Sequence, residues 1–154
     1  MANTYTQMHV QLVFAVKFRR CVILKVWRDS LFKYITGIIQ MHGHKLLCIN
    51  GVEDHIHILI GLRPTQALSS LVQEVKKASS KWVNDQKLVR GGFSWQEGFG
   101  AFSYSQNALP RVIRYIENQE EHHRKRNFRD EYTSLLKEYE IAFDHRYIFH
   151  DLTS

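Results

Sequence analysis

The sequence predicts a single α+β domain built around an antiparallel sheet, and three observations lead to this prediction. Short segments rich in β-branched residues alternate with segments whose apolar residues recur at helical spacing, in the order β-α-β-β-α-β. Only the short turn Glu53-Asp54 separates the second strand from the third, so these two strands should pair antiparallel. Two further helical segments follow the last strand. The length of 154 residues suits one domain over 1–154, in which the tail from about 143 is peripheral.

Four segments have the composition of strands. The first alternates, is rich in Val and Phe, and runs into a basic stretch. The third is β-branched and apolar, and glycines bound it at both ends, as expected for a strand in the middle of a sheet. The predicted strands span 8–18, 44–52, 55–61 and 101–105, and Tyr147-Ile148-Phe149 in the tail is expected to form a short extra strand.

Four segments are expected to be helices because their apolar residues fall on one face. The first ends at Gly43, and the third has Asn107 as its N-cap with Pro110 in the first turn. Asn127 and Asp130 could cap the fourth. The predicted helices cover about 27–39, 68–82, 108–125 and 128–140. This order is that of the ferredoxin-like split βαβ fold, with helices on one face of the sheet and extra C-terminal helices.

Composition limits the classes of function. The hydrophobic fraction of 44% is typical of a globular chain and excludes a disordered one. No apolar run approaches a membrane span and the N-terminus has no signal-peptide pattern, so we expect no membrane partner. Cys21 and Cys48 form no CxxC pair and are expected to be buried or half-buried thiols in a reducing cytoplasm. The net charge of +6 suggests a polyanionic partner such as nucleic acid.

A pair of histidines marks the third predicted strand. His55 and His57 are two residues apart, so they share one face while Ile56, Ile58 and Ile60 fill the other. Two imidazoles on one rigid strand can direct nitrogen lone pairs at a single divalent ion. The alternative is that two polar residues fall on the open face of a half-buried strand. The pairing in phase favours a metal site.

The third predicted helix carries a second candidate pair. Tyr115 and Gln119 are four residues apart and lie away from the apolar stripe, so their side chains should be one turn apart on the same face. From spacing alone, an ordinary amphipathic helix with an exposed Tyr and Gln is the simpler explanation. The functional alternative is a tyrosine nucleophile with a Gln amide oxygen as third ligand of the ion.

Taken together, these residues resemble the small HUH-type single-tyrosine transposases of the IS200-like family, which mobilise insertion sequences through single-stranded DNA. The motifs that carry the resemblance are His55-Ile56-His57 and Tyr115-Ile116-Glu117-Asn118-Gln119. Segments 12–17, 95–103 and 121–125 support it in the family's order and extend it over nearly the whole chain.

The resemblance implies a chemistry for these positions. His55, His57 and Gln119 would bind the metal, and Tyr115 would attack a phosphate of hairpin-flanked single-stranded DNA to form a 5′-phosphotyrosine. Imidazoles suit Mn²⁺ or Zn²⁺ better than Mg²⁺, but the family's usual cofactor is Mg²⁺ or Mn²⁺, and we expect one of these. The resemblance also implies a homodimer in which the tyrosine helix can complete the partner's site. A copy retained by its host as a palindrome-processing endonuclease is an alternative.

Other side chains are candidates for contacts with DNA. Trp95, Phe99 and Tyr104 could stack on bases, although packing is their commoner use. His122 and His123 could be a proton shuttle or further ligands, but a place near the DNA backbone or solvent is favoured. The basic residues that could contact phosphates, each also explicable as a solvated surface charge, are Lys17, Arg19, Arg20, Lys76, Lys77, Lys81, Arg124, Lys125 and Arg126.

Two other functions remain open at this level. A metal-dependent or two-histidine phosphodiesterase would use His55 and His57 without needing Tyr115. A non-catalytic, RNA-recognition-like sheet would use basic edges and stacking aromatic residues. The second alternative leaves the histidine pair and the Tyr–Gln pair unexplained.

Overall fold

The computed structural model describes residues 4–124 and 126–140, and its centre is a four-stranded sheet. The strands are β1 (His9–Ala15), β2 (Lys45–Gly51), β3 (His55–Gly61) and β4 (Gly100–Tyr104). Their order in the sheet is β2-β3-β1-β4, and every neighbouring pair is antiparallel. This confirms the predicted split βαβ fold, with strand ends within a few residues of those expected.

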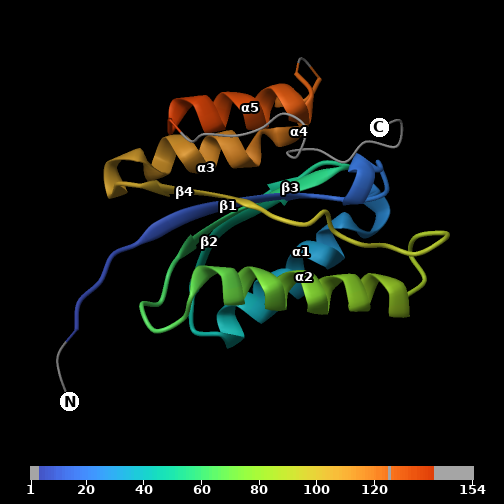
Figure 1. Cartoon of the computed structure of the whole chain (residues 1–154), viewed down its shortest axis with the longest axis horizontal. Coiled ribbons are helices and arrows are strands. Elements are labelled where there is room, and N and C mark those ends of the chain that lie inside the picture. The colour runs from blue at the N-terminus through green and yellow to red at the C-terminus, as the bar shows by residue number, and fades with distance from the viewer. Residues whose placement is uncertain (1–3, 125, 141–154) are drawn as a thin grey trace.

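Helices cover both faces of this sheet (Figure 1). On one face lie α1 (Lys25–Met41) and α2 (Leu68–Asp85), and on the other lie α3 (Leu109–Glu117), α4 (Gln119–His122) and α5 (Phe128–Glu138). Two short 3-10 helices, η1 (Lys17–Arg19) and η2 (Gln106–Ala108), complete the described elements. The prediction of helices on one face therefore holds for α1 and α2, while the C-terminal helices form a third layer over the opposite face.

The alternation along β3 separates the two faces as the sequence predicts. Ile56, Ile58 and Ile60 are fully buried in the main core under α1 and α2. Leu59, on the opposite face, packs with Val112 and Ile116 of α3. His55 and His57 therefore lie on the face covered by the C-terminal helices, not on an open face. This excludes the interpretation that they are two polar residues exposed on a half-buried strand.

The third predicted helix, 108–125, is not continuous. It breaks at Asn118, whose backbone angles of φ −98° and ψ 23° separate α3 from α4. The side-chain amide of Asn50 on β2 donates to the carbonyls of Ile116 and Glu117, both at 3.0 Å, and so satisfies the end of α3. Because this contact comes from a distant strand, helical periodicity could not predict the break.

The predicted caps have different outcomes. Asn107 lies in η2, and α3 begins after Ala108 without a side-chain cap, so the predicted Asn107 cap is wrong. Pro110 does lie at the start of α3. Asn127 accepts the backbone N–H of Asp130 at 2.9 Å and caps α5, as predicted. Gly43 ends α1 with φ +83°, a conformation that favours glycine.

The predictions for the C-terminal tail and for the two cysteines have different outcomes. The peripheral tail from 143 and the strand Tyr147-Ile148-Phe149 lie outside the described residues. Both cysteines are free; Cys48 is buried as expected, whereas Cys21 is exposed, contrary to the prediction.

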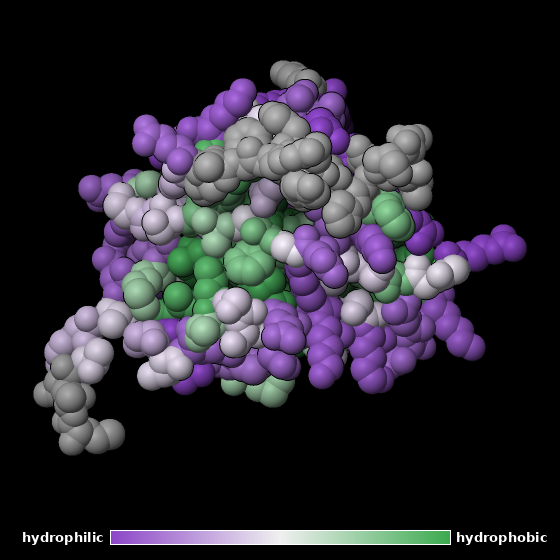
Figure 2. All heavy atoms as spheres, in the orientation of Figure 1, coloured by the Kyte–Doolittle hydropathy of each residue, from purple (hydrophilic) through white to green (hydrophobic). Residues whose placement is uncertain are grey.

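Among the described residues, no helix combines the length and apolarity needed to cross a membrane. Figure 2 shows hydrophilic residues along the lower margin of the molecule, where α2 runs in Figure 1, and hydrophobic residues gathered nearer the centre of this face.

Candidate active site

A hydrogen bond to the outer ring nitrogen orients each of the two histidines, His55 and His57. Both are fully buried on β3. The Nδ1 atom of His55 lies 2.8 Å from Oδ1 of Asp54, which accepts its proton and leaves Nε2 facing inward. The Nδ1 atom of His57 lies 2.8 Å from Nε2 of Gln11 on β1, the strand adjacent to β3. Each imidazole is thus held by its outer nitrogen, and the two Nε2 atoms are directed at one interior region.

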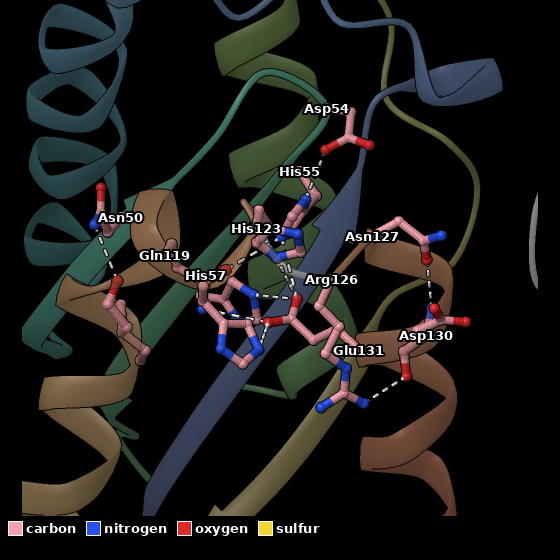
Figure 3. A network of polar contacts seen from close by, with 12 residues as sticks. Asn50, Asp54, His55, His57, Gln119, His123, Arg126, Asn127, Asp130 and Glu131 are labelled. Carbon is pink, nitrogen blue, oxygen red and sulfur yellow. Dashed lines mark hydrogen bonds and ion pairs between the residues drawn. The ribbon is translucent and has the colours of Figure 1, made fainter.

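Glu131 of α5 occupies the centre of that region, as Figure 3 shows. Its carboxylate is 1% exposed, and its Oε1 atom lies 3.0 Å from Nε2 of His57 and 3.2 Å from Nε2 of His55. The Nε2 atom of His123 is 3.1 Å from the same oxygen. Three imidazoles therefore converge on one carboxylate oxygen.

Tyr115 and Gln119 reach the same centre from α3 and α4. The Tyr115 hydroxyl donates a hydrogen bond to Oε2 of Glu131. The Gln119 Oε1 atom lies 3.3 Å from Nε2 of His55, and its amide nitrogen lies 3.3 Å from Oε2 of Glu131. The structure thus brings together all four residues predicted at the chemical centre, Tyr115, Gln119, His55 and His57. They meet within a single chain.

The electrostatics of the cluster depend on Glu131. Burial alone would lower the pKa of His55, but hydrogen bonds to Asp54 and Glu131 outweigh it and raise the pKa to about 9. Burial lowers the pKa of His57. Burial would raise the pKa of Glu131, but the surrounding imidazoles, first His57, hold it well below its usual range. A buried carboxylate is therefore ionised at neutral pH.

The tyrosine is not activated by this arrangement alone. Burial, and then the charge and hydrogen bond of Glu131, raise the pKa of Tyr115 above its ordinary value. The nearby Arg126 lowers it by less. A phenol in this setting holds its proton, so attack on a phosphate requires additional positive charge at the centre.

The donor atoms of this cluster fit a divalent ion. The buried side chains His55, His57 and Glu131 each offer one ligand atom, and these atoms all lie within 4.8 Å of one another. Ligand bonds of about 2.0–2.2 Å can therefore reach a common centre after small movements. The His122 Nε2 atom is buried and has no hydrogen-bond partner among the described residues, which leaves one more polar atom beside this centre.

The positions of His122 and His123 differ from the prediction. His123 contacts Glu131 rather than solvent, and its ring lies 4.5 Å from that of His55. His122 packs its ring 5.0 Å from that of Tyr115. His122 and His123 follow Tyr115 by seven and eight residues, so helical spacing along α3 and α4 directs both imidazoles to the side of the tyrosine.

The other predicted DNA contacts lie outside this cluster. Trp95 is buried against Phe14 and donates to Ser79, so it is a core residue. Phe99 is half-buried and packs against the core. Tyr104 donates its hydroxyl to Gln11 at 2.8 Å and thereby supports the residue behind His57.

The basic candidates are in varied surroundings. Lys76 donates to the carbonyls of Gln96 and Gly98, and burial lowers its pKa to about 8, so this ammonium already has a structural role. Lys81 pairs with Asp85 and Arg124 with Glu121 on the surface. Lys125 lies outside the described residues. Lys17 and Arg19 belong to η1, and Arg20 follows it. Lys77 is exposed on α2. Arg126 donates to the carbonyl of Asp130 and to the hydroxyl of Ser134.

A cavity of about 330 Å³ opens beside the tyrosine. It lies between β4, α3 and α5, and Tyr115 and Glu131 contribute to its wall. Arg111 and Arg126 also line it, so two guanidinium groups border the approach to the hydroxyl. The carboxylates of Glu131 and Glu138 also line it, so the cavity offers space and groups of both charges next to the candidate nucleophile.

The sequence alone does not single out Glu131, Asp54 or Gln11. One signal could have identified Glu131, because it falls with Phe128 and Leu135 on the buried face of α5, where a lone acidic residue is unusual. No comparable signal marks Gln11 or Asp54. Their roles depend on the antiparallel pairing of β1 with β3 and on the turn before His55.

Comparison with known proteins identifies the family of this chain. The family described as "Transposase IS200 like" matches residues 4–119. The chain is also similar to the ISDra2 transposase TnpA of Deinococcus radiodurans, with 25% identity over 118 residues, which cover 73% of this chain and 84% of that protein.

Two solved structures share the fold. One is a crystal structure of a protein from Deinococcus radiodurans R1 described as a candidate transposase, with a TM-score of 0.62 and 24% identity over 77% of this chain and 96% of that one. The other is a REP-associated tyrosine transposase bound to a REP hairpin, with a TM-score of 0.61 and 16% identity over 80% of this chain and 73% of that one. In this chain, α5 lies beyond the residues that the family matches.

Proposed function

We propose, because this chain belongs to the IS200-like transposase family, that it cleaves and rejoins single-stranded DNA through a covalent tyrosine intermediate at the hairpin-flanked ends of an element. The observation that carries the proposal is the meeting of Tyr115 with His55 and His57 around one buried carboxylate. A phosphodiesterase that used only the histidines would not need a tyrosine hydroxyl at this centre.

Tyr115 is the nucleophile in this proposal. Its phenolic oxygen forms a bond to the scissile phosphorus, and the bond from that phosphorus to the 3′ oxygen breaks. The phenol loses its proton, and the leaving oxygen gains one to become a free 3′-hydroxyl. The 5′-phosphotyrosine preserves the phosphodiester energy, so a later 3′-hydroxyl can attack and reseal the strand without ATP.

His55 and His57, with the Gln119 oxygen beside them, would hold the divalent ion, for which we propose Mg²⁺ or Mn²⁺. Bound there, the ion would stabilise negative charge on the scissile phosphate. Asp54 keeps the inner nitrogen of His55 available, and Gln11 holds the ring of His57. Burial of both rings limits competition from water at their Nε2 atoms.

The strand would approach through the cavity beside Tyr115. Arg111 and Arg126 border it and can contact phosphates on either side of the scissile bond. The other exposed basic candidates would contact the hairpin farther away; a relative with this fold is bound to a REP hairpin. We also propose that the protein acts as a homodimer.

A covalent adduct tests the proposed function. The full chain is incubated with end-labelled hairpin DNA and Mn²⁺, resolved on a denaturing gel, and the adduct is mapped by peptide mass spectrometry. Wild type should give DNA linked to the peptide that contains Tyr115, and Tyr115→Phe should give none. Tyr34→Phe is the control, because Tyr34 stacks on Trp82 on the far face of the sheet. Adduct on another tyrosine, or cleavage by Tyr115→Phe, would contradict the proposal.

A further inference from the structure

Glu131 is the one acidic side chain of the described site that is almost fully buried. It is 1% exposed and reaches the centre from α5, a helix outside the residues that the family matches. Its Oε1 atom lies 3.0–3.2 Å from the inner nitrogens of three imidazoles, which belong to His55, His57 and His123. A charged group so far from water needs a strong counter-charge at short range.

The hydrogen bond from His55 to Asp54 shows what that counter-charge can be. Asp54 accepts the Nδ1 proton, so a neutral His55 presents a lone pair at Nε2. A lone pair 3.2 Å from a carboxylate oxygen is repulsive unless a cation lies between or beside them. A proton on Nε2 can fill this role, and so can a metal ion shared by both groups.

The two carboxylate oxygens have different partners. Oε1 faces the imidazoles, whereas Oε2 accepts the hydroxyl of Tyr115 and the amide of Gln119. A carboxylate in this position can contact an ion through one oxygen and keep the tyrosine directed at the same centre through the other.

We propose that Glu131 is a ligand of the divalent ion, completing a set with His55 and His57, and that its second oxygen positions Tyr115. This inference rests on the proposed function and adds an anionic oxygen to a site otherwise made of neutral donors. Carboxylate oxygens are among the ligands that Mg²⁺ and Mn²⁺ prefer, so this oxygen makes the site more suitable for these ions than two imidazoles alone would be. It also comes from a helix that follows the tyrosine motif and lies beyond the residues that the family matches.

The competing explanation is purely structural. In that case, Glu131 forms an ion pair with His55 that holds α5 on the sheet, and its removal lowers stability without changing the affinity of the folded protein for metal. Binding and stability therefore have to be measured separately.

Isothermal titration of the full chain with Mn²⁺ separates the two explanations. Glu131→Gln keeps the shape and hydrogen-bonding capacity of the side chain but removes its charge. We expect Mn²⁺ affinity at least about tenfold weaker than wild type. Asp130→Asn is the matched control, because Asp130 is exposed on the same helix, and its affinity should equal that of wild type. Thermal unfolding of each metal-free variant reports the structural contribution.

Each outcome is decisive. Unchanged or tighter Mn²⁺ binding by Glu131→Gln, with binding lost in His57→Ala, would overturn the role of Glu131 and leave the proposed function intact. Undiminished binding by His57→Ala would instead contradict the metal site itself. If Glu131→Gln does not fold, a crystal structure of the wild-type protein with Mn²⁺ decides. A Glu131 oxygen at about 2.2 Å from the ion supports the proposal, and a carboxylate turned away from the ion refutes it.

Discussion

The hydroxyl of Tyr115 donates a hydrogen bond to the carboxylate of Glu131, a residue of the same chain that also contacts both strand histidines. The Tyr115 ring lies 5.8 Å from the ring of His57. The candidate nucleophile therefore faces the histidines of its own subunit. A site shared between subunits would require α3 and α4 to leave this position. The hydrogen bonds from Asn50 to the end of α3 would then break.

The first prediction concerns this arrangement within one chain. Subunits carrying His57→Ala are mixed with subunits carrying Tyr115→Phe, and hairpin cleavage is measured after subunit exchange has been confirmed with two affinity tags. Because each chain contains both halves of a site, the mixture should not cleave. Recovery toward half of wild-type activity would show that Tyr115 serves the partner's histidines, and would require α3 to reposition.

The second prediction concerns Asp54, which holds Nδ1 of His55 at 2.8 Å. Asp54→Asn can still accept this proton but no longer supplies a negative charge that makes the imidazole a stronger ligand. Mn²⁺ affinity measured by titration calorimetry should fall by about tenfold.

Asp29→Asn is the control for that change, because Asp29 is exposed on α1, away from the cluster. Its Mn²⁺ affinity should match that of wild type. Equal affinities for all three proteins would mean that Asp54 has no influence on the metal ligand.

The third prediction is a pH dependence of stability in EDTA. The pKa of His55 is raised to about 9 in the folded protein from 6.5, by Asp54 and Glu131 against the effect of burial. A raised folded-state pKa contributes stability that is fully present below about pH 6.5 and is lost as the pH rises through 9.

Urea unfolding of wild type and His55→Gln between pH 6 and 9.5 measures this contribution as the difference between the two curves. Lys76, whose pKa of about 8 has an opposite effect above that pH, is present in both proteins and cancels. We expect the advantage of wild type over His55→Gln to shrink as the pH rises. A difference that stays constant or grows would refute the assignment.

The fourth prediction concerns the close approach of β2 and β3 next to His55. A Cβ atom on Gly51 would lie 2.4 Å from the His55 carbonyl oxygen and 2.9 Å from the Ile56 Cα atom. Gly51→Ala must therefore push the strands apart, at a cost of about 1–3 kcal/mol in the free energy of unfolding. It should also weaken Mn²⁺ binding, because His55 moves with the backbone.

Gly37→Ala is the matched substitution. Apart from its own helix, no atom lies within 4 Å of a Cβ at Gly37 inside α1, so alanine should stabilise the protein by about 0.5–1 kcal/mol. Chemical denaturation compares the two variants. Similar stabilities would show that the strands can adjust to the additional methyl group.

The sequence by itself determined the sheet, the positions of most of its helices and four residues of the candidate site. Period-two alternation placed His55 and His57 opposite Ile56, and the family's motif singled out Tyr115 and Gln119. These features are local: they depend on side-chain periodicity and on motif spacing, both of which can be read without knowing what packs against each element.

Only the tertiary structure decided what closes the site. Asn50 of β2 donates to the carbonyl of Ile116 at the end of α3, a contact between residues 66 apart in sequence. Glu131 enters from α5, 74 residues after His57, and its place depends on how that helix packs on the sheet. Contacts between residues far apart in sequence leave no periodic signal, because they arise from the packing of whole elements. The charge at the centre of the site was therefore not predictable from the sequence, although the residues around it were.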